Sequence, residues 1–266
     1  MTTRSVIADP AIAEPVIEVR RVSKHFLKGD EDLVALREID LRVTQGSFLV
    51  LLGRSGCGKS TLLNLLAGLT VPTTGEIMYR GRSVRGPSTA VGYLTQHDTL
   101  MPWRDVTRNV EMPREVRGES RRTRSAVAAE LIKLVGLAGF ERHYPRELSG
   151  GMRRRASLAR MLCADPETLL LDEPFGALDA QLRRELQSEL LRLWSGTGRT
   201  VVFVTHDIDE ALILADRVVV LGPVGRVLLD QPVDLPRPRD PDDIRVDPHF
   251  VELHRSLSTA LKEGSR

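Results

Sequence analysis

A glycine-rich segment in the first quarter of the chain has the residue types needed to hold phosphate. It fits the pattern G-x-x-x-x-G-K-[ST], in which glycines let backbone N–H groups turn inward around phosphate oxygens. Lys59 is placed to reach the β- and γ-phosphates of a nucleoside triphosphate, and Ser60 to ligate Mg²⁺. The segment therefore predicts a phosphate-binding loop. Its residues are Gly53, Arg54, Ser55, Gly56, Cys57, Gly58, Lys59, Ser60 and Thr61.

A second group with suitable chemistry follows three consecutive leucines, Leu169 to Leu171. An apolar strand that ends in Asp172 would place this carboxylate beside the phosphate loop, where it can hold Mg²⁺ through water. Glu173 comes next and could polarise an attacking water, so hydrolysis as well as binding is expected. Many buried strands end in Asp, and the interpretation therefore depends on the phosphate loop.

The elements around the phosphate loop are those that such a loop requires. Residues 47–52 form a nearly continuous apolar run, which is typical of a strand buried on both faces. After the loop, Lys59 to Ala67 has the pattern of a helix that Gly68 terminates. The positive end of this helix dipole would point at the bound phosphates.

Strand and helix patterns alternate along most of the chain, which predicts an α/β fold with a mainly parallel sheet. Between about residues 96 and 164 the pattern is helical and indicates a lobe inserted into the sheet. The Pro- and charge-rich segment after Pro223, most clearly 230–247, predicts an irregular tail. Other strands are expected at 15–22, 36–43, 76–79, 90–94, 168–171, 200–205 and 217–221, and other helices at 122–135, 150–163, 180–194 and 208–214.

The composition fits one large globular unit with balanced charge. The chain has 266 residues, of which 41% are hydrophobic and 28% charged, with 38 Lys and Arg against 36 Asp and Glu. An excess of two positive charges does not indicate a surface that binds nucleic acid. The two cysteines, Cys57 and Cys163, have neither CxxC spacing nor a nearby His, which argues against a disulfide scaffold or a zinc site. No apolar run reaches the roughly 18–20 residues of a membrane span, and the start lacks the pattern of a signal peptide.

The segment Leu148 to Met152 narrows the choice among proteins with a phosphate loop. It resembles the signature of ATP-binding cassette (ABC) ATPases, although that family often has Gln where Met152 stands. The resemblance implies that Ser149, Gly150 and Gly151 open a helix and contact the γ-phosphate of an ATP bound to another copy of the chain. Two copies would then enclose two ATP molecules.

Other segments resemble the family's remaining motifs in the expected order. Gln96 is similar to the Q-loop glutamine, which contacts Mg²⁺ and the hydrolytic water. Asp179, in the segment 176–179, is similar to the D-loop residue at the dimer interface. His206 is similar to the switch histidine that contacts the γ-phosphate. Phe26 is the candidate for the aromatic ring that stacks on adenine, with His25 as the alternative.

Three further segments, 100–106, 222–227 and 247–250, resemble the ATPases of nitrate, sulfonate and taurine importers. The resemblance implies a peripheral subunit on the cytoplasmic face of a bacterial inner membrane. Its partners would be a second copy of itself, two transmembrane permease subunits and, indirectly, a solute-binding protein. Trp103 would either anchor a permease segment or pack within the lobe. A transporter of another cargo, a soluble ABC ATPase acting on DNA or ribosomes, and a P-loop kinase remain alternatives.

The resemblance also implies a division of the chain. A flexible tail over residues 1–14 would precede a nucleotide-binding domain over residues 15–229. That domain would have the P-loop NTPase fold, with a RecA-like core, an antiparallel β subdomain and the inserted helical subdomain at about residues 96–164. Residues 230–266 would form the C-terminal tail.

Overall fold

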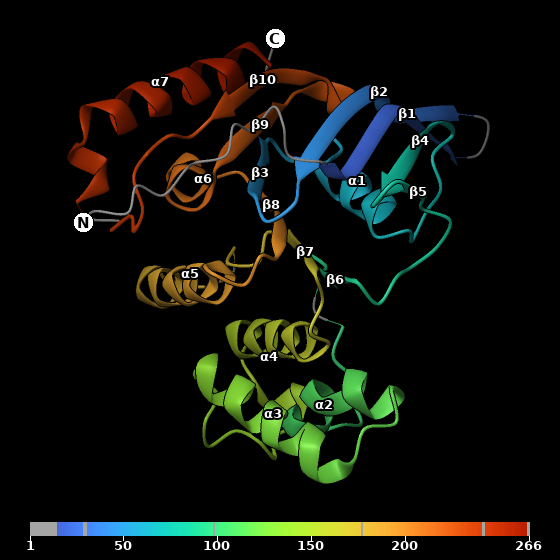
Figure 1. Cartoon of the computed structure of the whole chain (residues 1–266), viewed down its shortest axis with the longest axis vertical. Coiled ribbons are helices and arrows are strands. Elements are labelled where there is room, and N and C mark those ends of the chain that lie inside the picture. Colours follow the sequence, from blue (N-terminus) through green and yellow to red (C-terminus); the bar gives the residue numbers. More distant parts are fainter. Residues whose placement is uncertain (1–14, 29–30, 98, 177, 241–242, 265–266) are drawn as a thin grey trace, which may run out of the picture.

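The computed structural model describes residues 15–28, 31–97, 99–176, 178–240 and 243–264. The N-terminal tail expected over residues 1–14 lies outside these ranges. Two sheets, a group of helices around the larger sheet and a separate helical lobe make up the described chain (Figure 1).

The larger sheet carries the strands that end at the predicted site. Five of its six strands are parallel, and the edge strand β10 pairs antiparallel with β9. Because the parallel strands all end at one edge, residues that follow them in sequence meet there. The strand order is β10 (Val227–Pro232), β9 (Arg217–Leu221), β3 (Phe48–Gly53), β8 (Thr200–Thr205), β7 (Thr168–Asp172) and β6 (Val91–Leu94).

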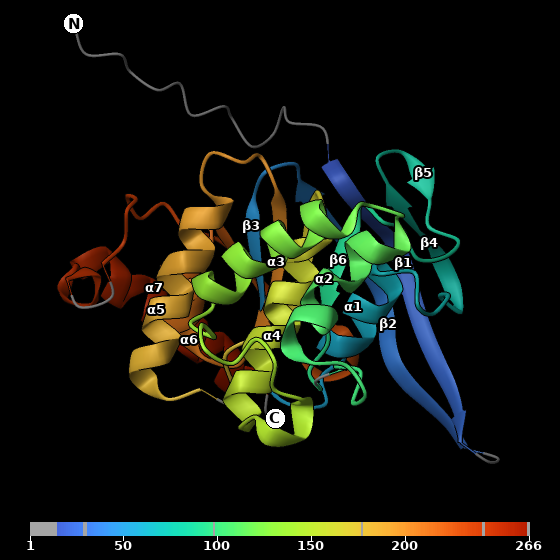
Figure 2. The ribbon, with the colours of Figure 1, turned by 90° about the horizontal axis from the view of Figure 1, so that it is seen from below.

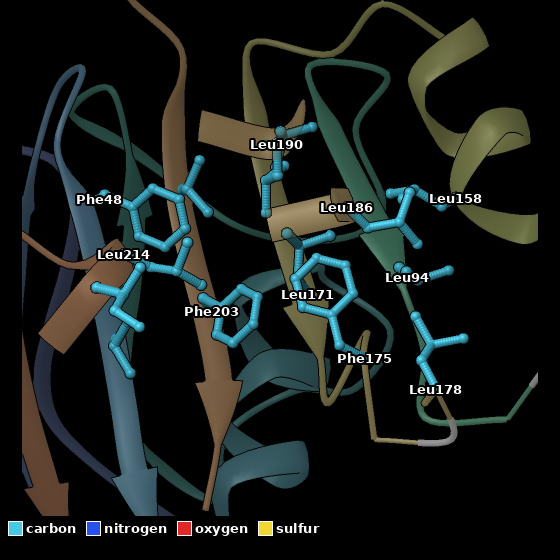
Figure 3. Close-up of a cluster of buried hydrophobic side chains, with 14 of the residues drawn as sticks. Phe48, Leu94, Leu158, Leu171, Phe175, Leu178, Leu186, Leu190, Phe203 and Leu214 are labelled. Atoms are coloured by element: carbon cyan, nitrogen blue, oxygen red, sulfur yellow. The ribbon is translucent and has the colours of Figure 1, made fainter. Parts of the chain in front are cut away.

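Strand β3 is buried on both faces, as its apolar run predicts. Phe48, Val50 and Leu52 point into one hydrophobic cluster, whereas Leu49 and Leu51 point into the other. The alternation follows from the two-residue period of a strand. The first cluster reaches from the sheet to Leu158 of the helical lobe, so the sheet and the lobe share a core (Figure 3).

Helices cover the two faces of this sheet. Helix α1 (Lys59–Leu66) packs on one face, while α5 (Ala180–Trp194), α6 (Ile208–Leu214) and α7 (Pro248–Glu263) contribute to the cluster on the other. The smaller sheet is antiparallel and lies next to α1 (Figure 1), and its buried side chains belong to the same hydrophobic cluster as those of α1. Its order is β2 (Glu31–Thr44), β1 (Pro15–Lys28), β4 (Thr74–Tyr79) and β5 (Arg82–Ser83).

The helical lobe lies between β6 and β7 in the chain, where the sequence predicts an insertion. It contains α2 (Val106–Val116), α3 (Arg121–Leu134), the short 3-10 helix η1 (Pro145–Glu147) and α4 (Gly150–Cys163). Side chains of Asp105, Ser120 and Ser149 cap the three α-helices by accepting a backbone N–H from the first turn. The sequence patterns predict a helical region here but do not predict α2, which contains Pro113, as a helix of its own.

The segment after Pro223 is more ordered than an irregular tail. The expected boundary at residue 229 falls inside β10, and α7 buries Phe250, Leu253 and Leu257 in the main core. These residues recur at helical spacing, and Asp247 caps the helix. Between β10 and α7 lie the short 3-10 helix η3 (Ile244–Val246) and the buried Arg239, which donates to the carbonyl oxygens of Leu212, Ala215, Val233 and Leu235. Hydrogen bonds donated by the buried Arg239 therefore hold this Pro-rich stretch in place, and such bonds leave no periodic pattern in the sequence.

Among the described residues, no helix combines the length and the apolar character that crossing a membrane requires.

Candidate functional site

A cavity of about 310 Å³ lies where β3 ends and α1 begins. It is lined by the phosphate loop, the start of α1, the hairpin between β1 and β2, and the residues that follow β6 and β7. The lining residues are Phe26, Leu33, Val34, Ala35, Ser55, Gly56, Gly58, Lys59, Ser60, Thr61, Gln96 and Glu173.

The phosphate loop wraps around the amino group of Lys59. This side chain is only 5% exposed, and its Nζ donates to the carbonyl oxygens of Gly53 at 2.7 Å and Arg54 at 2.8 Å. Gly56 and Gly58 have φ angles of 82° and 103°, which favour glycine. A Cβ on Gly58 would also lie 2.7 Å from the carbonyl oxygen of Ala35. The backbone geometry and the following helix thus suit an anion held close to Lys59.

Asp172 ends β7 and lies next to this loop. Its side chain is hydrogen-bonded to that of Ser60, and burial raises the pKa of Asp172, while Ser60, Lys59 and Arg154 oppose that rise. A buried carboxylate, a hydroxyl and the nearby amide of Gln96 provide the oxygen ligands that Mg²⁺ prefers. Ser60 and Gln96 line the cavity itself. The residues present therefore fit a magnesium ion beside the phosphates of a nucleotide in the loop.

Glu173 lines the cavity, and His206, which is not a lining residue, lies beside it. His206 Nδ1 lies 3.5 Å from Glu173 Oε1. They approach each other because β7 and β8 are parallel neighbours, and the Glu173 N–H donates to Val204 at 3.1 Å. A carboxylate here can accept a proton from water, and an imidazole can donate to a phosphate oxygen.

The β1–β2 hairpin brings an aromatic ring to the cavity and extends to one side of the molecule (Figure 2). Phe26 pairs with Leu33 across the hairpin, both side chains line the cavity, and Phe26 is 41% exposed. His25 is not among the lining residues and instead contacts Asp32, with Nδ1 2.9 Å from Oδ2. The hairpin geometry favours Phe26 for stacking on a flat ring. Leu33 and Val34 are lining residues that the sequence motifs missed, although the pairing of Leu33 with Phe26 and of Val34 with His25 could have found them.

Ser149, Gly150, Gly151 and Asp179 do not line this cavity. Ser149 is the N-cap of α4, accepting from the N–H of Met152 at 3.2 Å, and Asp179 is the N-cap of α5, accepting from Leu182 at 3.0 Å. The structure thus brings together Lys59, Ser60, Gln96, Glu173 and His206. It places the signature residues at the end of another helix.

Trp103 lies on the surface of the helical lobe and is 71% exposed. It borders a second cavity, of about 410 Å³, together with Arg104, Arg108, Glu111, Glu115, Arg121 and Arg124. Glu115 accepts from Arg104, and Glu111 lies 3.4 Å from Arg124. Trp103 therefore does not pack within the lobe, and four arginines surround two glutamates beside it.

Comparison with known proteins agrees with this geometry. Residues 36–176 match the family model described as ABC transporter. The taurine import ATP-binding protein TauB of Burkholderia pseudomallei is 44% identical over 234 residues, which is 86% of this chain and 90% of that protein. An uncharacterised ABC transporter ATP-binding protein of Methanocaldococcus jannaschii is 45% identical over 93% of this chain and 91% of its own length. The nitrate import ATP-binding protein NrtC of Synechococcus elongatus is 43% identical over 90% of this chain, which spans 37% of that protein.

Among solved structures, the dimeric post-hydrolysis state of the ATP-binding cassette MJ0796, bound to ADP and Pi, superposes with a TM-score of 0.78 at 31% identity. The match covers 82% of this chain and 99% of that one. The phosphate loop, the paired acidic residues and the signature helix all lie within residues 36–176, which match the family model. The chain belongs to the ABC transporter family as an ATP-binding subunit with an ATPase fold, and it hydrolyses ATP.

Proposed function

We propose that this ATPase drives the import of a small anion such as an aliphatic sulfonate, taurine or nitrate. The observation that carries the proposal is the similarity to TauB, a taurine import ATP-binding protein, over 86% of the chain. NrtC, a nitrate import ATP-binding protein, supports the same class of cargo. An importer subunit for another cargo is the alternative, because an ATPase subunit does not itself contain the transport path.

In the proposed mechanism, the residues around the cavity position ATP and an attacking water. Lys59 and the loop N–H groups bind the β- and γ-phosphates, and Phe26 stacks on adenine. Glu173 accepts a proton from the water as the water oxygen bonds to the γ-phosphorus, the bond between the γ-phosphorus and the bridging oxygen breaks, and ADP leaves. His206 and Gln96 orient the reacting groups. A magnesium ion held by Ser60, Gln96 and Asp172 would neutralise phosphate charge. Most of the rate enhancement would come from positioning and charge.

A second copy of the chain completes each site in this proposal. Ser149, Gly150 and Gly151 of one copy would contact the γ-phosphate held by the other, and Asp179 would lie at the interface. ATP binding would close the dimer, and hydrolysis would let it open. Opening and closing would then be passed to two permease subunits on the cytoplasmic side of the membrane, with a solute-binding protein supplying the cargo.

The surface around Trp103 is the proposed permease contact. An exposed indole is a good anchor for an apolar residue of a partner. The four arginines and two glutamates beside it leave an excess of positive charge, which suits an acidic side chain on the same partner segment. Gln96 and Trp103 lie seven residues apart in the chain, so one short segment links the proposed contact to the ATP site.

The cargo can be tested with the complex purified from its source together with its permease and solute-binding protein. We expect its ATPase rate to rise several-fold when the binding protein carries a sulfonate, taurine or nitrate. A complex that responds instead to a phosphate ester, a polyamine or a peptide would reject the proposed cargo. A chain that copurifies with DNA or ribosomes and no membrane subunit would reject the transport role itself.

The docking surface has its own test in the substitution Trp103→Ala. We expect this variant to lose copurification with the permease subunits while its own ATP binding stays normal. Val116→Ala is the matched control, since Val116 is also an exposed apolar residue of the lobe. If Trp103→Ala copurifies as wild type does, the proposed contact is wrong.

A further inference from the structure

Arg154 joins the helical lobe to the edge of the sheet that carries the ATP site. It lies in α4 and is 6% exposed. Its Nε donates to the carbonyl oxygen of Pro174 at 3.2 Å, and its Nη2 donates to that of Asp172 at 2.5 Å. Its Nη1 donates to the carbonyl oxygen of Gln96 at 3.2 Å and also to that of Thr95. One guanidinium therefore holds four backbone carbonyls in two segments.

The two segments are those that deliver the predicted catalytic groups. Thr95 and Gln96 follow β6, and the residues 172–174 end β7; these strands are parallel neighbours, with Leu94 opposite Leu171. The third element is α4, whose N-cap is Ser149 of the signature. A planar guanidinium with donors in a fixed fork can bind both segments at once, whereas a lysine ammonium is a single point.

We propose that Arg154 is a positioning residue that transmits the position of the helical lobe to Gln96, Asp172 and Glu173, and so sets the hydrolysis rate rather than the ATP affinity. The inference rests on the proposed roles of these three residues. The lobe also carries the Trp103 surface. A shift of the lobe caused by a partner would therefore move, through Arg154, the backbone carbonyls that follow β6 and those at the end of β7. The phosphate loop and the hairpin, which provide most of the cavity lining, lie outside the segments that Arg154 holds.

The neighbouring Arg155 provides a matched control. It lies in the same helix, and its Nη1 donates to the carbonyl oxygens of Val135 at 2.9 Å and Gly136 at 2.8 Å. Val135 is the C-cap of α3, and Gly136 is the residue after it. Arg155 thus also fixes backbone carbonyls, and these two hydrogen bonds lie within the lobe, while its charge also acts on Asp179 and Glu185 of α5.

The test compares Arg154→Met, Arg154→Lys and Arg155→Met in the full chain. For Arg154→Met we expect kcat for ATP hydrolysis to fall at least tenfold, with the Kd for ATP measured without magnesium unchanged within twofold. Arg154→Lys should recover part of the rate. Hydrogen exchange of the backbone amides at residues 95–97 should be faster in both Arg154 variants, and Arg155→Met should keep both the wild-type rate and the wild-type exchange there.

The opposite results overturn the inference. One is a kcat for Arg154→Met above half of the wild-type value. The other is a kcat that falls as much in Arg155→Met as in Arg154→Met, in proportion to a loss of thermal stability in each variant. If Arg154→Met does not fold, Arg154→Lys decides: wild-type kcat with wild-type exchange at residues 95–97 rejects the role. Asp172→Asn separates the two proposals, since an active Asp172→Asn would contradict the assigned site, whereas an active Arg154→Met alone would contradict only this inference.

Discussion

Glu173 combines a strained backbone with a chemically useful position. Its φ angle is 45°, a conformation that L-residues other than Asn and Asp rarely adopt and that costs about 1–3 kcal/mol. The strain persists because the Glu173 N–H is bound to Val204 of the neighbouring strand, while the carboxylate reaches the cavity near His206. A turn at this residue aims its side chain at the place where the phosphate loop would hold a nucleotide.

At this scale we predict that Glu173→Gln binds ATP normally but hydrolyses it at least about 10²-fold more slowly, because an amide cannot accept the proton of the attacking water. Steady-state phosphate release and equilibrium nucleotide binding measure the two quantities. Glu167→Gln is the control, since Glu167 is an exposed carboxylate that pairs with Arg80 before β7. Normal hydrolysis by Glu173→Gln would remove this residue as the general base.

At the scale of elements, α7 is part of the hydrophobic core that also contains strands of the larger sheet. Leu257 is fully buried and lies in the same cluster as Val218 and Val220 of β9, next to the central strand β3. Asp247 caps the helix through the N–H groups of His249 and Phe250. The chain after residue 230 therefore stabilises the sheet that positions the phosphate loop.

We accordingly predict that Leu257→Ala lowers the free energy of unfolding by about 2–5 kcal/mol, the usual result of leaving a cavity in a packed core. Urea unfolding of the purified chain measures the change. Val251→Ala, on the half-exposed side of the same helix, should change the unfolding free energy far less. Equal and small effects of both substitutions would mean that α7 contributes little to the fold.

At the scale of the whole molecule, the described chain contains the parts of an ATP site in two separate places. The cavity holds the phosphate loop and Glu173, whereas Ser149 caps α4 and does not line it. Solved structures of the similar cassette MJ0796 are dimeric. A head-to-tail pair of copies in which the signature of each faces the cavity of the other would unite the two parts.

We predict from this that Glu173→Gln forms a stable dimer in ATP and that adding Ser149→Arg prevents it while leaving ATP binding to the single chain intact. A bulky cation at the helix N-terminus would block the approach of the partner's phosphates. Size-exclusion chromatography with light scattering measures the mass. Ser195→Arg, at the exposed far end of α5, should still dimerise. Dimers that form despite Ser149→Arg would exclude this interface.

Much of the fold followed from local patterns. Several predicted elements, among them α4, α5, α6, β8 and β9, have the residues that the sequence patterns predict. Apolar period and caps are local properties, so a single sequence reports them well. The sequence patterns missed the C-terminal helix because Pro and charged residues dominate the segment before it. Only tertiary contacts show that Arg239 and Leu257 are buried.

For the site, the sequence determined the chemistry and the tertiary structure decided the neighbours. The phosphate-loop pattern and the paired Asp172 and Glu173 predict hydrolysis of a nucleoside triphosphate from residue type and spacing, and the segment at Ser149 adds the resemblance to ABC ATPases. That Glu173 reaches His206, that Leu33 lines the cavity beside Phe26 and that Arg154 joins α4 to two strand ends depend on contacts between distant segments. Strand order and helix packing create such contacts, and neither is encoded in a local pattern.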